Sequence, residues 1–461
     1  MIEVEKLKQK ILDLAIRGKL VPQDPNDEPA SVLIEKIKKE KEQLVKEGKI
    51  KASKNDSYIY KGSDNCYYEN NEIIEFIPPI ETNENIIWLR GESFIYKMES
   101  IKPTNKEFEY IDIEAINNKC NRIENPKKLL SSKAPSRATR KIYSSSTLFS
   151  MVRPYLRNIA YVGEQYKHCI ASTGFYVCTP LPFVDEKYLY YLLTSDYVVS
   201  SLNYYMKGDN SPSITTGDLE NLLYPIPSLE YQKRVVQLIE KIHPLIAKIE
   251  NYNNQLKLLI DKAKKQLLED IFGENSSYKS YYLNREKTNL SKLIDKDKIG
   301  DGDWILSSNM DNDGEYNLVQ LKHIGNGKYI DKTYQKISSS FFKENNCTEI
   351  HENDILINRI ISKGLNVCML PNINSKCITS VDVCWIAPDA GKYNQKYLMY
   401  LLLSPSFQKE VKLLSSGSTR MRISKSKLIK IEFLYHRDVS IQKQIVEDIE
   451  NKFKLLDQIC S

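Results

Sequence analysis

Apolar residues recur at alternating spacings of three and four between residues 229 and 271. This alternation is typical of the a and d positions of a coiled coil and predicts one long helix. At ~1.5 Å per residue the helix would be about 65 Å long. Pro244 is expected to kink it or to begin a second helix, and Gly273 to end it. The predicted seam consists of Val235, Leu238, Ile242, Leu245, Ile249, Tyr252, Leu256, Leu259 and Ala263.

Both ends of the chain repeat parts of this helical pattern. Gly18 follows the N-terminal apolar positions as Gly273 follows the central ones. We therefore predict that the two ends together form a second spacer, antiparallel to the first, and that each spacer buries its seam against the other. This arrangement would hold two globular domains apart about a pseudo-twofold axis. The apolar positions at the ends are Leu7, Ile11, Leu14, Ile441, Ile445, Ile449, Phe453 and Leu456.

The chain between the helical segments contains an internal repeat with a period of about 209 residues. Residues 188–193 return as residues 397–402 at this offset. Several further matches at nearly the same offset indicate two copies of one domain, at 86–228 and 274–439.

Each copy is predicted to contain short strands followed by one helix, because apolar runs alternate with turn residues. The helices are expected at 186–206 and 394–414. The mixture predicts an α/β (α+β) fold with two similar globular domains. The predicted strands are 108–113, 147–152, 159–162, 317–321, 354–358 and 367–370.

Residues 19–85 differ in composition from both copies. Prolines flank a helix predicted at about 31–47, in which lysines alternate with glutamates. This segment is interpreted as a linker with one solvated, charged helix. The predicted organisation is an N-terminal helix 1–18, the linker 19–85, domain 86–228, central spacer 229–273, domain 274–439 and C-terminal helix 440–461.

The composition indicates a protein of several domains without a membrane segment. The 461 residues carry a formal net charge of +6, which is only mildly basic. No apolar run approaches the ~20 residues that cross a bilayer, and no secretory signal begins the chain, so we expect a cytoplasmic protein. Nine scattered cysteines without Cys-x-x-Cys spacing are expected to be ordinary thiols.

Motifs for common catalytic chemistries are absent from the sequence. There is no Gly-x-x-x-x-Gly-Lys-Ser/Thr loop, and Pro78-Pro79 lies between isoleucines where an amino-methyltransferase needs a polar and an aromatic residue. The five histidines show no metal-ligand spacing, so neither a metal site nor a catalytic residue is predicted. A dispersed nuclease site stays open, because carboxylates are plentiful.

A basic turn follows a predicted strand in both copies. The first turn contains Arg153, Tyr155 and Arg157, and the second contains Arg359 and Lys363. An arginine at a strand exit can contact a guanine edge through two hydrogen bonds or a phosphate through one. A surface ion pair is the alternative for each of them.

A polar turn with glycine follows the predicted helix of each copy. Glycine permits close approach of the backbone, and small polar side chains can hydrogen-bond a phosphate or a base. A turn that merely ends the helix is the alternative. The candidate DNA-binding residues of these turns are Lys207, Asn210, Ser211, Ser418, Thr419, Arg420 and Arg422.

Residues 18–29, 148–157 and 224–232 are the most specific parts of a resemblance to a known family. The chain resembles, over nearly its whole length, the specificity (S) subunit of type I restriction-modification systems. The resemblance implies two target-recognition domains held apart by long helices, each reading one half of a bipartite site in double-stranded DNA. The chain departs from the pattern at 435–438 and at Ser211-Pro212, which concerns loop contacts rather than the architecture.

The resemblance also implies a non-catalytic chain that acts within a complex. Two methyltransferase (modification) subunits would methylate adenine with S-adenosylmethionine, and motor-nuclease (restriction) subunits would consume ATP, so S-adenosylmethionine, ATP and Mg²⁺ are expected on the partners. The alternatives are the specificity subunit of a methylation-only or related system, a coiled-coil scaffold that binds no DNA, and a single-chain nuclease. Neighbouring genes, gel shifts with the partners, and incubation of the pure chain with DNA and Mg²⁺ would distinguish them.

Overall fold

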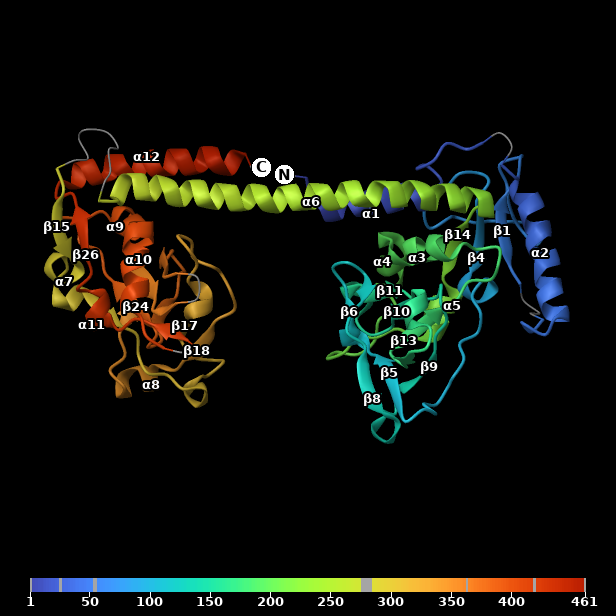
Figure 1. Ribbon diagram of the computed structural model, residues 1–461, viewed down its shortest axis with the longest axis horizontal. Coiled ribbons are helices and arrows are strands. Elements are labelled where there is room, and N and C mark those ends of the chain that lie inside the picture. Colours follow the sequence, from blue (N-terminus) through green and yellow to red (C-terminus); the bar gives the residue numbers. More distant parts are fainter. Residues whose placement is uncertain are drawn as a thin grey trace. The chain divides into compact units, whose positions relative to one another are not determined.

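The computed structural model describes residues 2–24, 27–52, 56–274, 284–361, 364–417 and 420–459 (Figure 1). The chain divides into two compact units, residues 2–251 and 252–461, which are called the first and the second domain below. Both domains combine helices and sheets, which confirms the predicted fold class. None of the described helices has the length and apolar character needed to cross a membrane.

Two small sheets form the centre of the first domain. Their strands are β5 (Glu107–Ile111), β8 (Lys127–Leu130), β9 (Ala138–Lys141), β10 (Thr147–Ser150), β11 (Ile159–Tyr161), β12 (Ile170–Ser172) and β13 (Phe175–Cys178). The four-stranded sheet has the order β8-β5-β12-β9 with a parallel central pair, and the antiparallel three-stranded sheet has the order β11-β10-β13. Ile111, Leu148 and Ala171 bring both sheets into one buried apolar cluster.

The second domain repeats this arrangement. Its strands are β16 (Ile299–Asp301), β17 (Tyr316–Val319), β18 (Gln335–Ile337), β19 (Glu349–Ile350), β20 (Ile355–Asn358), β22 (Asn366–Met369), β23 (Lys376–Thr379) and β24 (Val383–Ile386). The sheet β18-β17-β23-β19 again has a parallel central pair, and in the sheet β16-β24-β20-β22 the edge strand β16 is an addition. The matching strand orders confirm the internal repeat.

Each domain has two consecutive helices where the sequence predicts one. They are α3 (Glu186–Thr194), α4 (Asp196–Asn203), α9 (Gln395–Leu403) and α10 (Pro405–Leu414). The predictions of single helices over 186–206 and 394–414 are wrong, because a serine interrupts each. The hydroxyl of Ser195 accepts the N–H of Val198, and that of Ser404 accepts the N–H of Phe407, so each serine caps the second helix.

In each domain a strand that comes before these elements in the chain pairs, antiparallel, with a strand that comes after them. The pairs are β4 (Ile87–Arg90) with β14 (Leu223–Ile226) and β15 (Glu286–Asn289) with β26 (Glu432–Tyr435), preceded at β14 and β26 by α5 (Thr216–Asn221) and α11 (Lys425–Leu428). The last strand of each pair leads directly into a long helix, which begins at residue 229 in one case and at residue 439 in the other.

Residues 19–85 belong to the first domain and differ from the predicted solvated linker. β1 (Tyr58–Lys61) pairs with the second edge of β4, and β2 (Tyr67–Glu69) and β3 (Glu72–Ile74) extend this sheet to five strands. The helix α2 (Ala30–Lys46) buries Leu33, Ile34, Ile37 and Leu44 in the core of the domain. Its many charges conceal this narrow apolar stripe in the composition, which is why the sequence indicates a solvated helix.

The central helix α6 (Leu229–Phe272) runs through Pro244 without a second helix beginning there. Pro244 is exposed, so water can replace the hydrogen bond that a proline removes from a helix.

The buried face of α6 agrees with the predicted seam in part, since Val235 is fully buried and several other seam residues are half-buried. Leu245 and Leu259 are 56% and 62% exposed, whereas the next residues, Ile246 and Ile260, are buried. Tyr252 is also exposed. Where two apolar residues are adjacent, as at 245–246 and 259–260, the sequence does not show which of them faces the core. The elements that pack against the helix determine this.

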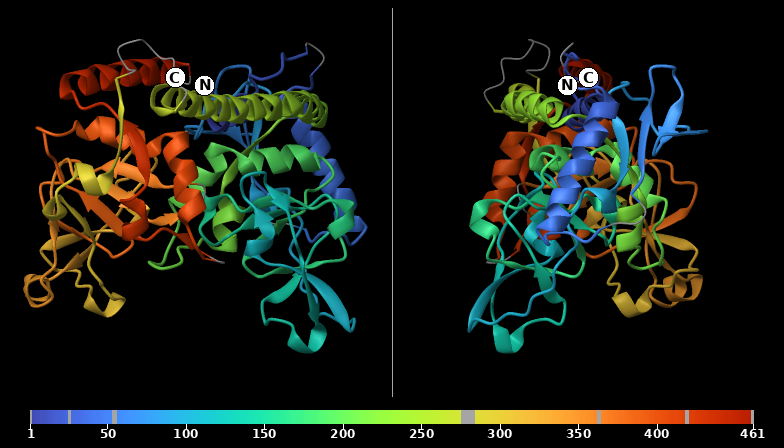
Figure 2. Two further views of the ribbon diagram at one scale, coloured as in Figure 1. Left: turned by 60° about the vertical axis from the view of Figure 1, so that its left-hand side comes forward. Right: turned by 90° about the vertical axis from the view of Figure 1, so that its right-hand side faces the viewer.

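The two end helices each pack on α6 within their own domain. In the first domain Lys8 of α1 (Val4–Ile16) lies 3.9 Å from Glu250. In the second domain α12 (Val439–Gln458) runs antiparallel beside the end of α6 (Figures 1 and 2), and Lys264 forms an ion pair of 2.6 Å with Asp457. The helices predicted at the two ends of the chain are therefore present, one in each domain.

A buried glutamine fixes the start of both long helices. The side-chain oxygen of Gln232 accepts the N–H of Asp185 at 2.7 Å, and its amide nitrogen donates to the carbonyl of Pro227 at 2.8 Å. Gln442 repeats both contacts at the start of α12, each at 2.7 Å. Both glutamines are fully buried, so each domain holds its helix by the same two hydrogen bonds.

Candidate nucleic-acid interface

In the first domain the two segments predicted to bind DNA lie side by side. Val152 and Ser213 form an antiparallel backbone bridge, and the N–H of Arg153 donates to the carbonyl of Pro212 at 2.8 Å. The turn after β10 and the loop after α4 therefore form one continuous surface, although about 50 residues separate them in the chain.

The arginines of this turn tie it to α4 and the following loop. Both have a left-handed backbone, with φ of 49° at Arg153 and 54° at Arg157. Arg153 donates to the carbonyl of Asn210 at 2.6 Å, and Arg157 donates to the carbonyl of Thr194 at 2.7 Å and pairs with Asp196. Because a guanidinium has five N–H donors, both side chains retain donors for a ligand.

The remaining predicted residues of the first domain are exposed on the same surface. Tyr155 is 45% exposed on a single turn of 3-10 helix (Pro154–Leu156) between the two arginines. Lys207, Asn210 and Ser211 are exposed in the loop after α4, which closes on itself through the backbone bridge between Lys207 and Ser213. The structure thus brings together all the predicted residues of this domain.

The second domain pairs the equivalent segments. β21 (Ile360–Ile361) and β25 (Met421–Arg422) form a short antiparallel ladder. Ser416 and Arg422 form a backbone bridge that corresponds to the bridge between Lys207 and Ser213. The same backbone arrangement therefore occurs at the same place in both domains.

Shared hydrogen bonds show which residues are equivalent in the two turns. The N–H of Ile214 donates to the carbonyl of Met151 at 2.9 Å, and the N–H of Ile423 donates to the carbonyl of Arg359 at 3.1 Å. Arg359 therefore corresponds to Met151 and not to Arg153. The sequence suggests the other correspondence because an arginine follows the strand in both copies.

The side chain of Arg359 is buried, with only 4% exposed. Its Nε lies 3.1 Å from a carboxylate oxygen of Asp301, and its terminal nitrogens donate to the carbonyls of Val381 and Ile423. This position differs from the exposed DNA contact that the sequence predicts. In the structure Arg359 supports the surface from inside.

Arg420 and Arg422 are exposed, Arg422 in the ladder of the second domain and Arg420 just before it in the chain. Arg422 forms an ion pair of 2.9 Å with Asp382. Lys363, Ser418 and Thr419 lie outside the described residues, so their DNA-binding roles stay predictions.

The sequence analysis missed two asparagines that hold the turn of the first domain. Asn118 donates its side-chain amide to the carbonyl of Leu156 at 2.9 Å, and Asn121 donates to the carbonyls of Arg157 and Ile159 at 3.0 and 3.1 Å. They lie on the hairpin of β6 (Ile116–Asn117) and β7 (Arg122–Ile123). Asn121 has a positive φ, and a run of asparagines is a turn signal that could have located this hairpin.

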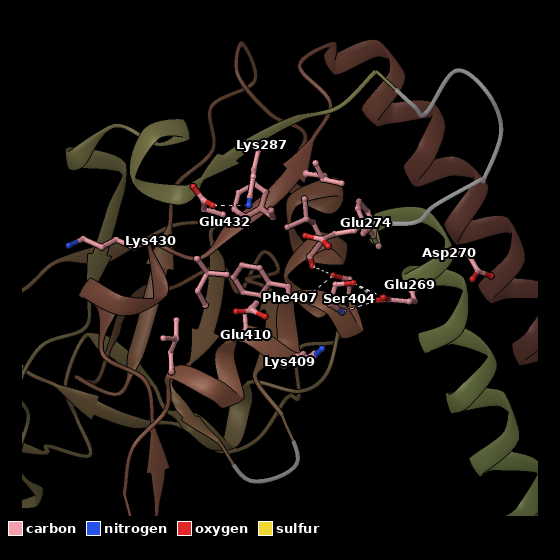
Figure 3. Close-up of a pocket in the computed structure, with 18 residues that line it drawn as sticks. Glu269, Asp270, Glu274, Lys287, Ser404, Phe407, Lys409, Glu410, Lys430 and Glu432 are labelled. Carbon is pink, nitrogen blue, oxygen red and sulfur yellow. Dashed lines mark hydrogen bonds and ion pairs between the residues drawn. The ribbon is translucent and has the colours of Figure 1, made fainter.

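A groove of about 1260 Å³ in the second domain has a lining of mixed charge, and some of its charged side chains are engaged with neighbours (Figure 3). Glu269 accepts hydrogen bonds from the N–H and hydroxyl of Ser406, near the N-terminus of α10. Lys287 and Glu432 form an ion pair of 3.0 Å. The groove combines charges of both signs and presents no catalytic constellation among these residues.

One group of histidine, cysteine and carboxylate side chains comes together among the described residues. His168 lies 3.1 Å from the carboxylate of Glu109, and the thiol of Cys169 lies 3.6 Å from the same oxygen. Burial, and then the charge of Glu109, raise the pKa of the Cys169 thiol to about 12. The thiol is therefore protonated at neutral pH, and hydrogen bonds within the group account for its geometry.

Comparison with known proteins places both domains in one family. The profile of the type I restriction modification DNA specificity domain matches residues 90–258 and 285–459. The EcoAI type I restriction enzyme specificity subunit of Escherichia coli is 71% identical over 51 residues, which are 11% of this chain and 9% of that protein. The MjaVIII type I restriction enzyme specificity subunit of Methanocaldococcus jannaschii is 26% identical over 284 residues, which are 59% of this chain and 65% of that protein.

In both matches the aligned part is less than two thirds of the relative's length. A chain from structural work on complex assembly and conformational transition of the type I R-M system has the same fold, with a TM-score of 0.58 and 23% identity. The match covers 84% of this chain and 93% of that chain. Because the family profile matches both domains and most of the sequence, the chain belongs to the family of type I restriction modification DNA specificity domains.

Proposed function

We propose that this chain is the sequence-specific DNA-recognition subunit of a type I restriction-modification complex, and that each domain reads one half of a bipartite target. The observation that carries the proposal is the equivalent pairing of two loops in both domains. Reading two half-sites requires the same kind of surface twice on one chain. A single binding site would not require a duplicated domain.

The paired loops have the chemistry that DNA recognition needs. Arg153, Lys207 and Arg420 offer charged donors, which can contact base edges in the major groove or phosphates. The backbone around them is held by hydrogen bonds, while equivalent positions differ, as at Ser213 and Arg422. A shared framework with different side chains supports two domains that read different base sequences.

The long helices supply surface for partner proteins. Tyr252, Leu258 and Leu259 of α6 are 64%, 68% and 62% exposed in the second domain. Adjacent exposed apolar side chains on a helix indicate a protein contact. We propose that the methyltransferase (modification) subunits dock on the helices, which also set the spacing of the half-sites.

The chain itself contributes recognition and positioning rather than catalysis in this proposal. Adenine methylation with S-adenosylmethionine belongs to the modification subunits, and ATP- and Mg²⁺-dependent DNA movement and cleavage belong to the motor-nuclease subunits. Transfer of methyl groups to DNA by the purified chain with S-adenosylmethionine alone would refute the non-catalytic role.

The test is to map methylated adenines across the genome in cells with and without this gene. We expect one bipartite motif to lose its methylation on deletion and to regain it when the gene is returned. An unchanged pattern in a strain that expresses the modification subunits would reject the proposal. Methylation of the motif without any restriction of unmodified DNA would identify a methylation-only system.

A further inference from the structure

Equivalent segments of the two domains carry opposite charge. Residues 196–221 of the first domain and 405–430 of the second match at an offset of 209 and include α4 with α5 and α10 with α11. The second-domain segment contains seven Lys or Arg and one Glu, whereas the first-domain segment contains one Lys and four Asp or Glu. The formal charge is therefore +6 in one domain and −3 at the equivalent place in the other.

Resting on the proposed function, we infer that the second domain binds the DNA phosphate backbone through this α10–α11 surface and supplies the larger share of the electrostatic affinity. The equivalent segment of the first domain has a net negative charge and therefore attracts phosphate less strongly, although its loop takes part in the proposed DNA surface. The surface, called the second-domain basic patch below, consists of Lys409, Lys412, Arg420, Arg422, Lys425, Lys427 and Lys430.

The charges of the patch are largely uncompensated. Within the part of the chain that the structure describes, Arg422 is the one member with an ion pair, to Asp382. All members are exposed except the half-buried Lys425. Exposed cations without a carboxylate partner lose no internal contact when they neutralise DNA phosphates, and each such contact releases counterions that were condensed on the DNA.

The patch is continuous with the paired loops of the second domain. Arg422 is part of the ladder with β21, and Lys427 donates to the carbonyl of Leu414 at 3.2 Å, which holds α11 against the C-terminal end of α10. Lys409 and Lys430 both line the groove of Figure 3, whose lining also contains five carboxylates, one of which, Glu432, is paired with Lys287. Phosphate contacts and base contacts would therefore lie on one face of the domain.

The first domain carries most of its comparable cations in another segment of the chain, and some of them are ion-paired. Residues 122–157 contain nine Lys or Arg and one Glu, against equal numbers of both signs in the equivalent residues 330–365. Four of the nine are ion-paired, which lowers their attraction for phosphate. The pairs are Lys127 with Asp112 and Glu114, Lys128 with Glu109, Lys141 with Glu99, and Arg157 with Asp196.

Two triple variants with the same change in net charge test the inference. K409Q/K412Q/K430Q removes three uncompensated charges of the patch, and K127Q/K128Q/K141Q removes three ion-paired lysines of the first domain. Each full chain is purified with its modification subunits, and binding to a duplex with the target is measured from low to high salt. Each lost phosphate contact lowers the salt slope by about 0.9.

We expect the patch variant to lower the slope by about 2 to 3 and to weaken binding at low salt at least about tenfold, for target and unrelated DNA alike. The first-domain variant should change the slope by less than about 1. The variant K409R/K412R/K430R keeps the charges and should restore the slope, which excludes a folding defect as the cause.

Equal slopes for the two glutamine variants, or a larger change in the first-domain variant, would overturn the inference and leave the proposed function intact. Absence of DNA binding by the unaltered complex at every salt concentration would overturn the proposed function and this inference together.

Discussion

Met151 directly follows β10 in the first domain, and Arg359 directly follows β20 at the equivalent position in the second. Both residues accept the same backbone hydrogen bond from the loop that pairs with the turn. The methionine is half-buried and uncharged, whereas the arginine is buried, lies beside Asp301 and holds two carbonyls. One backbone arrangement thus supports two different sets of side-chain contacts.

The difference teaches that the framework and the reading surface of each domain are separable. The framework consists of a buried sheet and of backbone hydrogen bonds between turn and loop, and these recur in both domains although different side chains support them. The loop side chains are then free to differ, as Ser213 and Arg422 do at one bridge position. Four experiments would break or sharpen this comparison.

The largest effect is expected from exchanging residues 86–228 for the corresponding part of a relative that has another target. Because the first domain holds α6 through backbone-directed contacts of Gln232, a new domain can be accommodated without altering the second. We expect a complete change of one half of the methylated motif, measured by mapping methylated adenines. Simultaneous loss of both halves would show that the domains do not read independently.

Replacing Arg359 with Ala should destabilise the second domain by roughly 2 to 4 kcal/mol, because Asp301 and two carbonyls lose a buried partner. Urea unfolding of the full chain would measure the change, with Met151→Ala as the matched variant in the first domain. Arg359→Met tests whether the charge rather than the volume is needed. Unchanged stability with lost DNA affinity would instead identify Arg359 as a direct DNA contact.

The second domain should be stabilised by mild acid through Asp354, which is buried where the first domain has Ser146. Burial raises the pKa of Asp354 to about 6. Ser146 does not titrate, and its hydroxyl forms a hydrogen bond with the hydroxyl of Thr179. The unfolded carboxyl has a pKa near 3.9.

The folded domain therefore binds a proton more tightly than the unfolded chain. This contribution to stability is complete below about pH 4, is lost as the pH rises through about 6, and amounts to at most about 3 kcal/mol. The free energy of unfolding of Asp354→Asn, subtracted from that of the unaltered chain at each pH, should isolate it. Ser146→Ala should give a difference that does not vary with pH, and a flat difference for Asp354→Asn would reject the assignment.

The smallest effects are expected from Arg153→Ala in the first domain and Arg420→Ala in the second. A bidentate base contact would cost about 1 to 3 kcal/mol of binding and relax one base in one half-site, because the wrong base no longer leaves a donor unpaired. Binding to a panel of single-base target variants would measure this. An equal loss for all sequences would assign the arginine to a phosphate, and no loss for either would move the DNA surface away from these loops.

The repeat and the long helices could be predicted because they follow from periodic patterns. Apolar spacing gave α6 and the two end helices, and the offset of 209 gave two copies with matching strand orders. The two loops could be named from composition, but their pairing through Val152 and Ser213 is a tertiary contact that no local pattern carries.

The errors have local physical causes. Ser195 and Ser404 end one helix and cap the next, although the apolar residues around them continue the helical pattern. The burial of Arg359 depends on Asp301, which lies 58 positions earlier in the chain and became its partner only through the added strand β16. In the same way α2 shows a charged composition and still buries an apolar stripe.

The two buried glutamines also imply an order in which the two domains anchor their helices during synthesis of the chain. Gln232 forms hydrogen bonds with residues 185 and 227, which precede it in the chain. The first domain can therefore anchor the start of α6 soon after residue 232 has left the ribosome. Gln442 does the same for the second domain about 210 residues later, which is about 10 to 40 s of synthesis at ~5–20 residues per second. During that interval the beginning of α6 is already anchored while α12, the helix that covers its end, has not been made. We therefore expect the nascent chain to expose the apolar face of the growing helix to chaperones or partner subunits before release.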